Sequence, residues 1–558
     1  MDCYVINRTM ACWGLILLPF MNVEAQNLPK IIGDAKTMAQ HYMPDFSYAG
    51  YHNGEVPLPK TTKNIILATD YGVVPNDGLD DSKALKKAMM AANEVNGDVI
   101  LQLPAGQLVL SDILYIERGH FVLRGTGAGE GGTELFYPRP MMYLDNPESL
   151  TELREYLLEF DKRQIEEENN IDLPFSQYAW SGGYIWTQVP GERVKSYLGK
   201  YDSPPQVLAK VSHGNRGEHV LEVSNLNGLQ VGDVVELQLF NKNGERGDII
   251  NELYKGTPVK PGSHHWQFPN LPLVRQQVEI TAITNNKVTI KTPLTIGIKP
   301  SYEAQLVAWK HLKEVGIEHL SIRFPDTPRV AHHVEQGYNG IFLTRVFNSW
   351  VQDVVINNAE SGILTEEIAN VTIKDIVTKG NNMAHYTVAM AAVHHVLVNN
   401  LKVYNNVVHP LSFNTFSTKN VYQNCEVFLN PVLDQHSGAN HQNLFDNIIV
   451  HLNPLQDHSY PLFAGGGAPY WKPSHGAYST FWNLNVQVES KLDVPKPLKL
   501  DGMNDGPYAR IIGVHGNGNY ELNYQPNAYI ELVNTSLDNI PSLYDYQLKK
   551  RLNYKIKK

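Results

Sequence analysis

The chain has 558 residues, of which 42% are hydrophobic and 19% are charged, a composition typical of a folded protein and too apolar for a disordered one. Its 47 lysines and arginines are outnumbered by 57 aspartates and glutamates, which gives a formal net charge of -10. It shows no basic patch of the kind that neutralises phosphates, so we expect no nucleic-acid partner.

The first 25 residues have the pattern of a secretory signal peptide. Arg8 precedes an apolar stretch over residues 10–21, and Val23 and Ala25 have the spacing expected just before a cleavage point. The stretch is too short to predict a membrane span. We therefore expect cleavage near Ala25 and export to a bacterial periplasm or beyond. The mature chain would keep only Cys425 of the three cysteines, and so could form no internal disulfide.

The next segment carries the motif of a capped coil. A phrase with Asp77, Gly78, Asp80 and Asp81 leads into an Ala- and Lys-rich helix predicted over residues 83–92, and strands are predicted around residues 99–103 and 121–124. Here the chain resembles the right-handed parallel β-helix (pectin-lyase-like) family of carbohydrate-active proteins, in which such a segment caps the first coil. The resemblance covers roughly residues 61–136 and 305–535. Because hydrolases, lyases and viral tailspikes share this scaffold, it implies a fold rather than one reaction.

The chain divides into five predicted regions. After the signal peptide, residues 26–136 form an N-terminal extension and the first coils. Residues 137–300 form an insertion whose part from about 206 to 300 alternates in strand fashion and reads as a small β-rich subdomain. Residues 301–535 hold the main β-helix, and residues 536–558 form a basic tail that is a terminal helix or a frayed end.

A repeat in the second half of the chain carries the fold prediction. Short apolar phrases each contain one polar anchor, and the anchors are Asp353, Asp375, Asn400, Asn424 and Asn447. They are separated by 22, 25, 24 and 23 residues, an interval that suits one coil of a β-solenoid. We therefore predict an all-β chain: a right-handed parallel β-helix with an N-terminal capping helix and a small β-rich insertion.

Equivalent positions of successive coils lie about 4.8 Å apart, so polar residues at one repeat position form a column. Glu360, His385 and His409 each stand fifteen residues before an anchor, and the run from Asp434 to His441 occupies nearly the same place in the next coil. Clusters of imidazole and carboxylate groups gather at functional sites because the groups shift one another's pKa. This column is the predicted catalytic site.

The residue types favour a lyase acting on a uronic acid. Such an enzyme removes the proton beside the sugar carboxylate and protonates or releases the bridging oxygen, tasks that suit histidine and tyrosine. We expect His385 or His409 to act as general base, Tyr386 or the other histidine as acid, and Glu360 and Asp434 as orienting groups. The expected substrate contacts are His436, His441, Arg345, Lys379, Asn414, Asn440 and the candidate stacking platform Trp471.

Two alternatives stay open. A glycoside hydrolase usually needs two carboxyl groups about 5 to 9.5 Å apart, whereas Glu360 and Asp434 are expected about 14 Å apart. A non-catalytic carbohydrate-binding solenoid is the second alternative. The expected partner is an acidic polysaccharide, and the expected assembly is a monomer or a small homo-oligomer.

No metal ligand set is assigned from the sequence. Histidines on stacked strands would form a line rather than a tetrahedron, and the cofactor is left unknown, with Ca²⁺ on Glu360 and Asp434 possible but not required. The remaining histidine pairs, at residues 264–265, 332–333 and 394–395, are expected to be packing or surface residues.

Overall fold

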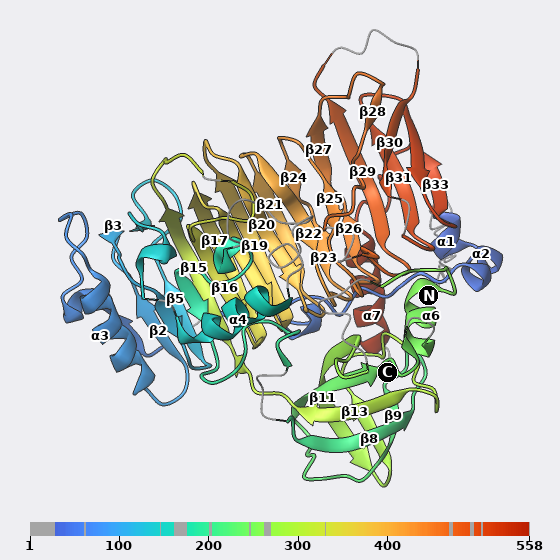
Figure 1. The fold of residues 1–558 in the computed structure, drawn as a ribbon, viewed down its shortest axis with the longest axis horizontal. Helices are drawn as coiled ribbons and strands as arrows, with labels where there is room; N and C mark the ends of the chain where they lie inside the picture. The colour runs from blue at the N-terminus through green and yellow to red at the C-terminus, as the bar shows by residue number, and fades with distance from the viewer. Residues whose placement is uncertain are drawn as a thin grey trace, which may run out of the picture.

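The body of the molecule is a parallel β-helix. The computed structural model describes residues 28–60, 63–145, 147–160, 176–199, 204–244, 247–261, 269–329, 331–467, 472–490, 496–503 and 506–556. Most coils contribute one strand to a long first sheet and one to a second sheet, and the strands pair in parallel from coil to coil (Figure 1). The predicted fold class is therefore confirmed. The predicted signal peptide lies outside the described residues.

The first sheet runs the length of the β-helix. Its strands are β1 (Ile65–Leu67), β2 (Val99–Gln102), β3 (Gly106–Val109), β5 (Phe121–Arg124), β6 (Thr133–Phe136), β14 (Leu312–Lys313), β15 (Val315–Arg323), β17 (Val346–Asn357), β19 (Ala369–Lys379), β21 (Leu397–Val403), β23 (Val421–Gln423), β24 (Glu426–Val427), β26 (Leu444–Asp446), β27 (Ile449–Leu452), β29 (Thr480–Val488), β31 (Arg510–Gly516) and β33 (Tyr529–Val533).

Two smaller sheets complete the coils. The second sheet consists of β4 (Leu114–Ile116), β7 (Ile185–Thr187), β16 (Asn339–Thr344), β18 (Ser361–Glu366), β20 (Ala384–Ala391), β22 (Val407–Phe413) and β25 (Leu433–Gln435). The third consists of β28 (Ser459–Tyr460), β30 (Leu498–Met503) and β32 (Tyr520–Tyr524). Between the sheets lies a continuous core of leucine, isoleucine, valine and aromatic side chains, and its burial is the main source of stability in a chain with no disulfide among its described residues.

The residue at one repeat position of the central coils adopts a left-handed backbone conformation, and these residues build a polar ladder along the first sheet. Asp353, Asp375, Asn400, Asn424 and Asn447 have φ between 52° and 56°. Asn400 Nδ2 donates to Asp375 Oδ1, and Asn447 Nδ2 donates to Asn424 Oδ1, both at 2.7 Å. Asparagine and aspartate tolerate this backbone region better than most residues. The predicted repeat anchors thus occupy equivalent positions in successive coils.

Helices and a terminal extension protect the sheets. The capping helix α3 (Ser82–Asn93) buries Leu85, Ala88, Met89 and Ala92, a spacing that puts them on one face, and it packs on β1 and β2. The other helices are α1 (Lys30–Gly33), α2 (Ala35–Gln40), α4 (Thr151–Phe160), α6 (Asp248–Tyr254) and α7 (Leu543–Ile556). Short 3₁₀ turns are η1 (Tyr51–Gly54), η2 (Ala68–Tyr71), η3 (Met141–Tyr143), η4 (Glu148–Leu150) and η6 (Gln177–Ala179).

The C-terminal tail forms the helix α7 and packs on the N-terminal extension. Tyr544 Oη donates to the carbonyl of Ala49 at 2.9 Å, and Arg551 donates to the carbonyls of Ser47 and Asn53. The extension in turn lies on the first sheet, where Gly50 N–H donates to the carbonyl of His395 at 2.7 Å. Of the two forms expected for the tail, the helix is the one observed.

The β-rich insertion is a closed antiparallel barrel that projects from one side of the β-helix (Figure 1). Its strands are β8 (Val207–His213), β9 (Val220–Ser224), β10 (Val234–Phe240), β11 (Val274–Thr284), β12 (Lys287–Ile290) and β13 (Glu303–Ala308). The last strand lies beyond the predicted boundary near residue 300, because β13 closes the barrel by pairing with both β10 and β8. No helix in the described part of the chain is long and apolar enough to cross a membrane.

Three histidines are buried at one corner of the coils. His394, Thr418 and His441 stand in consecutive β-bridges, and His395 is buried beside them. Burial lowers the pKa of both His395 and His441 to about 3, and burial also holds the pKa of His394 well below its usual value. These residues are therefore neutral core groups, as expected for the 394–395 pair.

Acidification should destabilise the fold through these histidines. The unfolded chain binds a proton on each near pH 6.5, whereas His395 and His441 stay neutral in the folded chain until about pH 3, so stability is lost as the pH falls through that window. Each contributes about 1.4 kcal/mol of unfolding free energy per pH unit. Chemical denaturation across this range measures the slope. His441→Gln should reduce the number of protons taken up on unfolding by about one, and the same change at exposed His213 should not. Equal pH slopes of the unfolding free energy in both variants would contradict the burial of a neutral imidazole at His441.

Candidate active site

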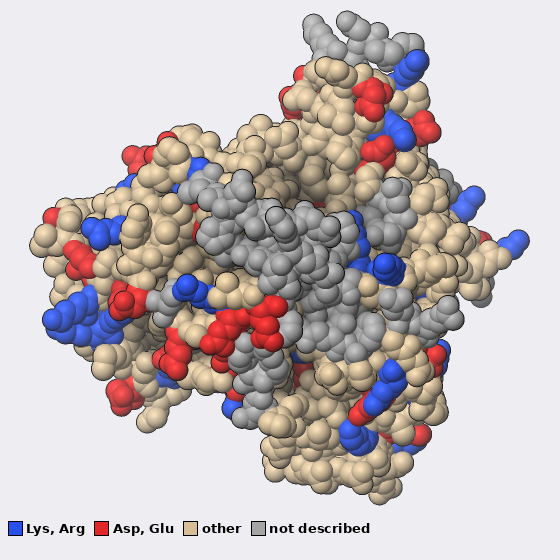
Figure 2. All heavy atoms as spheres, viewed as in Figure 1, with Lys and Arg blue, Asp and Glu red and all other residues tan. Residues whose placement is uncertain are grey.

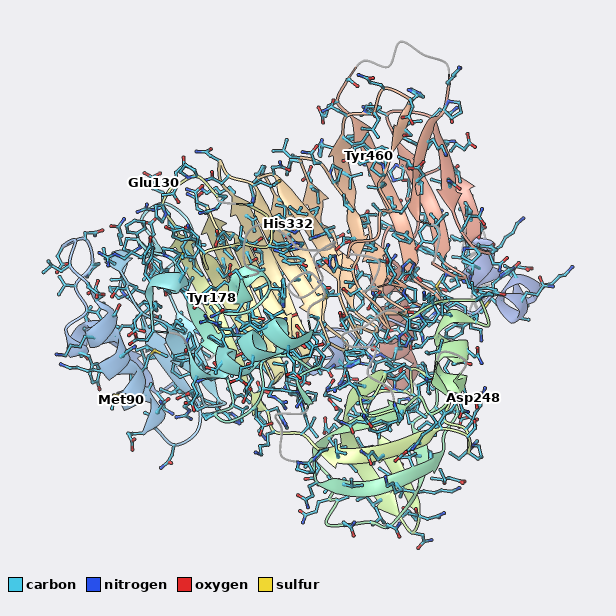
Figure 3. All side chains as sticks on the ribbon, in the orientation of Figure 1. Met90, Glu130, Tyr178, Asp248, His332 and Tyr460 are labelled. Atoms are coloured by element: carbon cyan, nitrogen blue, oxygen red, sulfur yellow. The ribbon has the colours of Figure 1, made fainter. Side chains whose placement is uncertain are left out.

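A cavity of about 340 Å³ lies against the second sheet. Its lining combines imidazole, aromatic and small polar groups. The lining residues are Trp180, Lys195, Ser196, Tyr197, His332, His333, Leu364, Thr365, Glu366, His385, Tyr386, Ala389, Ala391, His409, Asn414, Thr415, His436, Ser437 and Gly467. Three chain segments distant in sequence meet here: the strands of the second sheet, the segment around residues 180–197, and the loop that carries His332. Figure 3 shows His332 over the middle coils of the β-helix.

The segment around residues 180–197 forms one wall. Helix α4 supports it, since the rings of Tyr156 and Tyr197 lie 5.0 Å apart. At one end of the cavity Lys195 Nζ lies 3.0 Å from Glu366 Oε2, and the N–H of Ser196 donates to Glu366 Oε1 at 2.9 Å. Lys195 and Glu366 are both buried. The two charges neutralise each other. We therefore assign this ion pair a structural role at the end of the cavity.

Three rings form a continuous stack on strands β20 and β22. The ring centroids of His385 and Tyr386 lie 4.1 Å apart and those of Tyr386 and His409 lie 5.1 Å apart, and all three side chains are buried. Tyr386 pairs opposite His409 across the two strands, and the N–H of His385 donates to the carbonyl of Glu360. The predicted column is thus shifted by one residue: Tyr386, not His385, is level with His409. By strand register, the turn after β22 is one residue longer than the turn after β20. His385 and His409 are both fifteen residues before their anchors, so the sequence spacing alone does not reveal this difference.

His385 lies between a carboxyl group and a second imidazole. Its Nδ1 is 2.9 Å from Glu335 Oε1, and its Nε2 is 3.0 Å from His332 Nε2. Burial, reinforced by the neighbouring His332 and His409, holds the pKa of His385 well below its usual value, and burial raises the pKa of Glu335 to about 8. Nε2, the ring nitrogen on the other side, faces His332 on the loop that lines the cavity.

Asp434 lies between two other histidines. Its Oδ2 is 3.2 Å from His409 Nδ1 and 3.3 Å from His436 Nδ1. The N–H of Gly466 donates to Oδ1 at 2.8 Å, and Ser412 Oγ donates to Oδ2 at 2.6 Å. Burial opposes ionisation of Asp434, but the two imidazoles outweigh it and hold its pKa far below the usual value. Burial likewise lowers the pKa of His436.

Of the predicted residues, the structure gathers His385, Tyr386, His409, Asp434, His436 and Asn414 around this cavity. Glu360 lies nearby but serves the backbone: its carboxylate accepts N–H groups from Gln336, Gly337 and Tyr338, the last two at 2.7 and 2.8 Å. Glu360 is therefore a structural carboxylate that fixes the loop carrying Glu335 and His332. Among the described residues its carboxylate makes no hydrogen bond to the histidines of the predicted column.

Four other predicted contacts lie elsewhere. Arg345 is buried 2.9 Å from Glu367 Oε2, and Lys379 is exposed in a different groove, beside Glu134 and Arg323. Asn440 is fully buried and donates to the carbonyls of Ser437 and Ser474, and His441 belongs to the buried corner described above. Trp471 lies outside the described residues.

Sequence reasoning missed the residues that the loops supply. His332 and His333, predicted to be packing or surface residues, both line the cavity, and Glu335 lies behind His385. They belong to the connection between β15 and β16 and have no counterpart in other coils, so no repeat signal marks them. Trp180 and Tyr197 come from the long insertion and carry no repeat signal either.

Among the described residues, two groups of side chains lie close enough to ligate a metal ion. His332, His333 and His385 form one, and His409, Asp434 and His436 form the other, each with its ligand atoms within 4.8 Å of one another. Not all of these residues stand on stacked strands, because His332 and His333 come from the connection between β15 and β16 and His436 directly follows β25.

Comparisons with known proteins yield structural likenesses alone. No protein-family model matches the sequence, and no curated protein matches it. The solved structures that it resembles include the tailspike protein gp49 from Pseudomonas phage LKA1, with a TM-score of 0.42 and 11% identity over 84% of this chain and 78% of that one. DFA-IIIase from Arthrobacter chlorophenolicus A6, solved without its lid, gives a TM-score of 0.37 and 10% identity over 84% and 94% of the two chains.

A third likeness is to the gp54 tailspike of Acinetobacter baumannii bacteriophage AP22, solved in complex with A. baumannii capsular saccharide. Its TM-score is 0.34, with 10% identity over 84% of this chain and 69% of that one. Likenesses this distant carry no information about the reaction of this chain. The class that the structure itself defines is the parallel β-helix, and the function must be argued from the site.

Proposed function

We propose that this chain is a secreted polysaccharide lyase that cleaves a uronate-containing polysaccharide by β-elimination. The observation that carries the proposal is the stack of His385, Tyr386 and His409 in the wall of the cavity. Elimination needs one group to remove the proton beside the sugar carboxylate and another to protonate the departing bridging oxygen. Imidazole and phenol groups perform such transfers near neutral pH when a pocket holds them in place.

The contacts favour a particular division of roles. His385 is the general base: Glu335 lies 2.9 Å from its Nδ1, and Nε2, which contacts His332 in this structure, is the nitrogen that accepts the proton. Tyr386, stacked on His385, is the acid that gives its proton to the bridging oxygen as the carbon–oxygen bond breaks. The electron pair of the broken C–H bond becomes the new carbon–carbon double bond. Asn414 and Trp180 line the cavity where they can contact the sugar.

Hydrolysis fits the cavity less well. A glycoside hydrolase needs two carboxyl groups facing the bond to be cut. Among the described lining residues the carboxylate is that of Glu366, and Lys195 and the N–H of Ser196 occupy both of its oxygens. Glu335 and Asp434 lie against the histidines instead. The groups that line the reactive part of the cavity are therefore mainly imidazoles and a phenol.

A substrate panel tests this proposal. The purified chain is incubated with glycosaminoglycans, alginate, pectin and neutral polysaccharides, and each reaction is followed by near-ultraviolet absorbance and by reducing ends. We expect one of the uronate polymers to give an unsaturated, absorbing product. Reducing ends without absorbance would identify a hydrolase, and binding without either product would identify a non-catalytic solenoid; both results would overturn the proposal.

A further inference from the structure

The group formed by His409, Asp434 and His436 has the dimensions of a metal site. The distances from Asp434 Oδ2 to the Nδ1 atoms of His409 and His436 are 3.2 and 3.3 Å. Zinc bonds to imidazole nitrogen and carboxylate oxygen measure about 2.0–2.2 Å, so neighbouring ligand atoms in a tetrahedral site stand about 3.3 Å apart. The two observed distances are therefore those of two edges of a zinc polyhedron.

One ring nitrogen of the group has unmet bonding capacity. His436 Nδ1 is buried and has no hydrogen-bond partner among the described residues, although it lies 3.3 Å from Asp434 Oδ2. Leaving a buried polar atom without a partner costs free energy, and a bound cation would satisfy the nitrogen that faces it. An unpartnered His436 nitrogen beside a carboxylate that also contacts His409 is the feature that a bound cation would explain.

The surroundings hold the carboxylate in place. Ser412 Oγ and the N–H of Gly466 each donate to one oxygen of Asp434, which fixes the plane of the carboxylate. Partners of this kind orient metal ligands and raise affinity. Position 466 also requires glycine, because a Cβ there would lie 1.9 Å from His436 Nδ1. The local backbone is thus shaped to bring the three side chains together.

We propose that His409, Asp434 and His436 bind one divalent transition-metal ion of the zinc class at the wall of the cavity. Two imidazoles and one carboxylate suit zinc and neighbouring metals, whereas calcium prefers a shell of oxygens. The three protein ligands leave a coordination position for an outside oxygen. His409 and His436 both line the cavity, so that position faces a bound molecule.

The role of the ion rests on the proposed function. Elimination builds negative charge on the substrate carboxylate, and a cation beside it lowers the barrier. Within the described lining the basic side chain is Lys195, which already pairs with Glu366, and the two cationic side chains among the predicted substrate contacts, Arg345 and Lys379, lie elsewhere. A zinc-class ion at Asp434 would supply the missing positive charge.

Zinc titration of the full chain tests the site without reference to activity. The protein is stripped with a chelator, and calorimetry with Zn²⁺ alone measures affinity and stoichiometry, with Ca²⁺ as a comparison. We expect one high-affinity zinc per chain and weak calcium binding. His436→Ala should abolish the zinc site, and Ser412→Ala, which keeps all three ligands, should weaken it about 10–100-fold. His332→Ala, in the other histidine group, is the matched control and should keep it.

The outcomes separate the site from the function. Absence of zinc binding, or zinc binding that survives His436→Ala, or loss in His332→Ala instead, would overturn the site. Zinc binding with no elimination on the panel would overturn the proposed function and support the site. Elimination by a chelated chain that binds no zinc would overturn the site and support the function.

Discussion

His385→Gln is expected to lower kcat/KM on the cleaved polysaccharide by about 10²- to 10⁴-fold, the usual contribution of a positioned general base. The loss should fall mainly on kcat, because glutamine keeps the size of the side chain and much of the cavity while removing the nitrogen that accepts the proton. Tyr386→Phe should give a loss of similar size, since phenylalanine preserves the stack with His385 and His409 and removes only the hydroxyl group.

The matched control for His385→Gln is His441→Gln. Both positions hold buried histidines, but His441 lies at the buried corner with its Nδ1 3.1 Å from the carbonyl oxygen of Ala439, away from the cavity. Initial rates over a range of substrate concentrations, together with circular dichroism to verify folding, make the comparison. Equal losses in the two variants, or an unchanged kcat in His385→Gln, would remove His385 from the mechanism.

Glu367→Gln is expected to destabilise the chain by about 3–5 kcal/mol, the usual cost of breaking a buried ion pair. The carboxylate of Glu367 lies within 2.9 Å of guanidinium nitrogens of Arg193, Arg275 and Arg345. Burial opposes its ionisation, but the three arginines outweigh burial and lower its pKa to about 2. Glutamine would remove the negative charge that these three guanidinium groups share.

The position of Glu367 makes this effect more than local. Arg275 comes from barrel strand β11, Arg193 from the segment beside the cavity, and Arg345 from the turn before β17, so one carboxylate joins the barrel, the wall of the cavity and the β-helix. Thermal unfolding should show a lower Tm for Glu367→Gln. Glu303→Gln, which loses more exposed pairings with Lys210 and Lys242, should change stability by at most about 1 kcal/mol. Similar small effects in both would contradict the role assigned to Glu367.

The repeat made the fold predictable. The spacing of Asp353, Asp375 and Asn400 marks one left-handed backbone position that recurs at the same place in each of these coils. The capping helix was predictable for a similar reason, since its cap and its apolar face lie within a few residues of each other. The repeat spacing is periodic and the helix pattern is local, so both can be recognised in the sequence without knowledge of distant contacts.

The site was predictable only where it shares that periodicity. His385 and His409 stand on repeated strands, and the column led to them; Glu360 stands in the same column, yet its carboxylate turns to the backbone of residues 336–338. A repeat position does not fix the direction of a side chain when the turn lengths vary by one residue. His332, Glu335 and Trp180 come from unique loops and an insertion, where nothing in the spacing indicates which coil they approach.

Surface charge bears on the kind of substrate as well. Figure 2 shows lysine and arginine side chains in small separate groups among acidic ones on the visible face, which agrees with the absence of a basic patch in the sequence. We expect an acidic polymer to be held by contacts within the cavity. Such binding should depend only weakly on salt, unlike that of proteins that follow a polyanion along its backbone.

The most direct test of β-elimination is product mass spectrometry after cleavage in water enriched in heavy oxygen. Elimination breaks the sugar–oxygen bond without adding water, so the account predicts an unsaturated product that lacks one water relative to the hydrolysed sugar and carries no heavy oxygen. A saturated product carrying one heavy oxygen atom at the newly formed end would show hydrolysis, and would contradict the roles proposed for His385 and Tyr386.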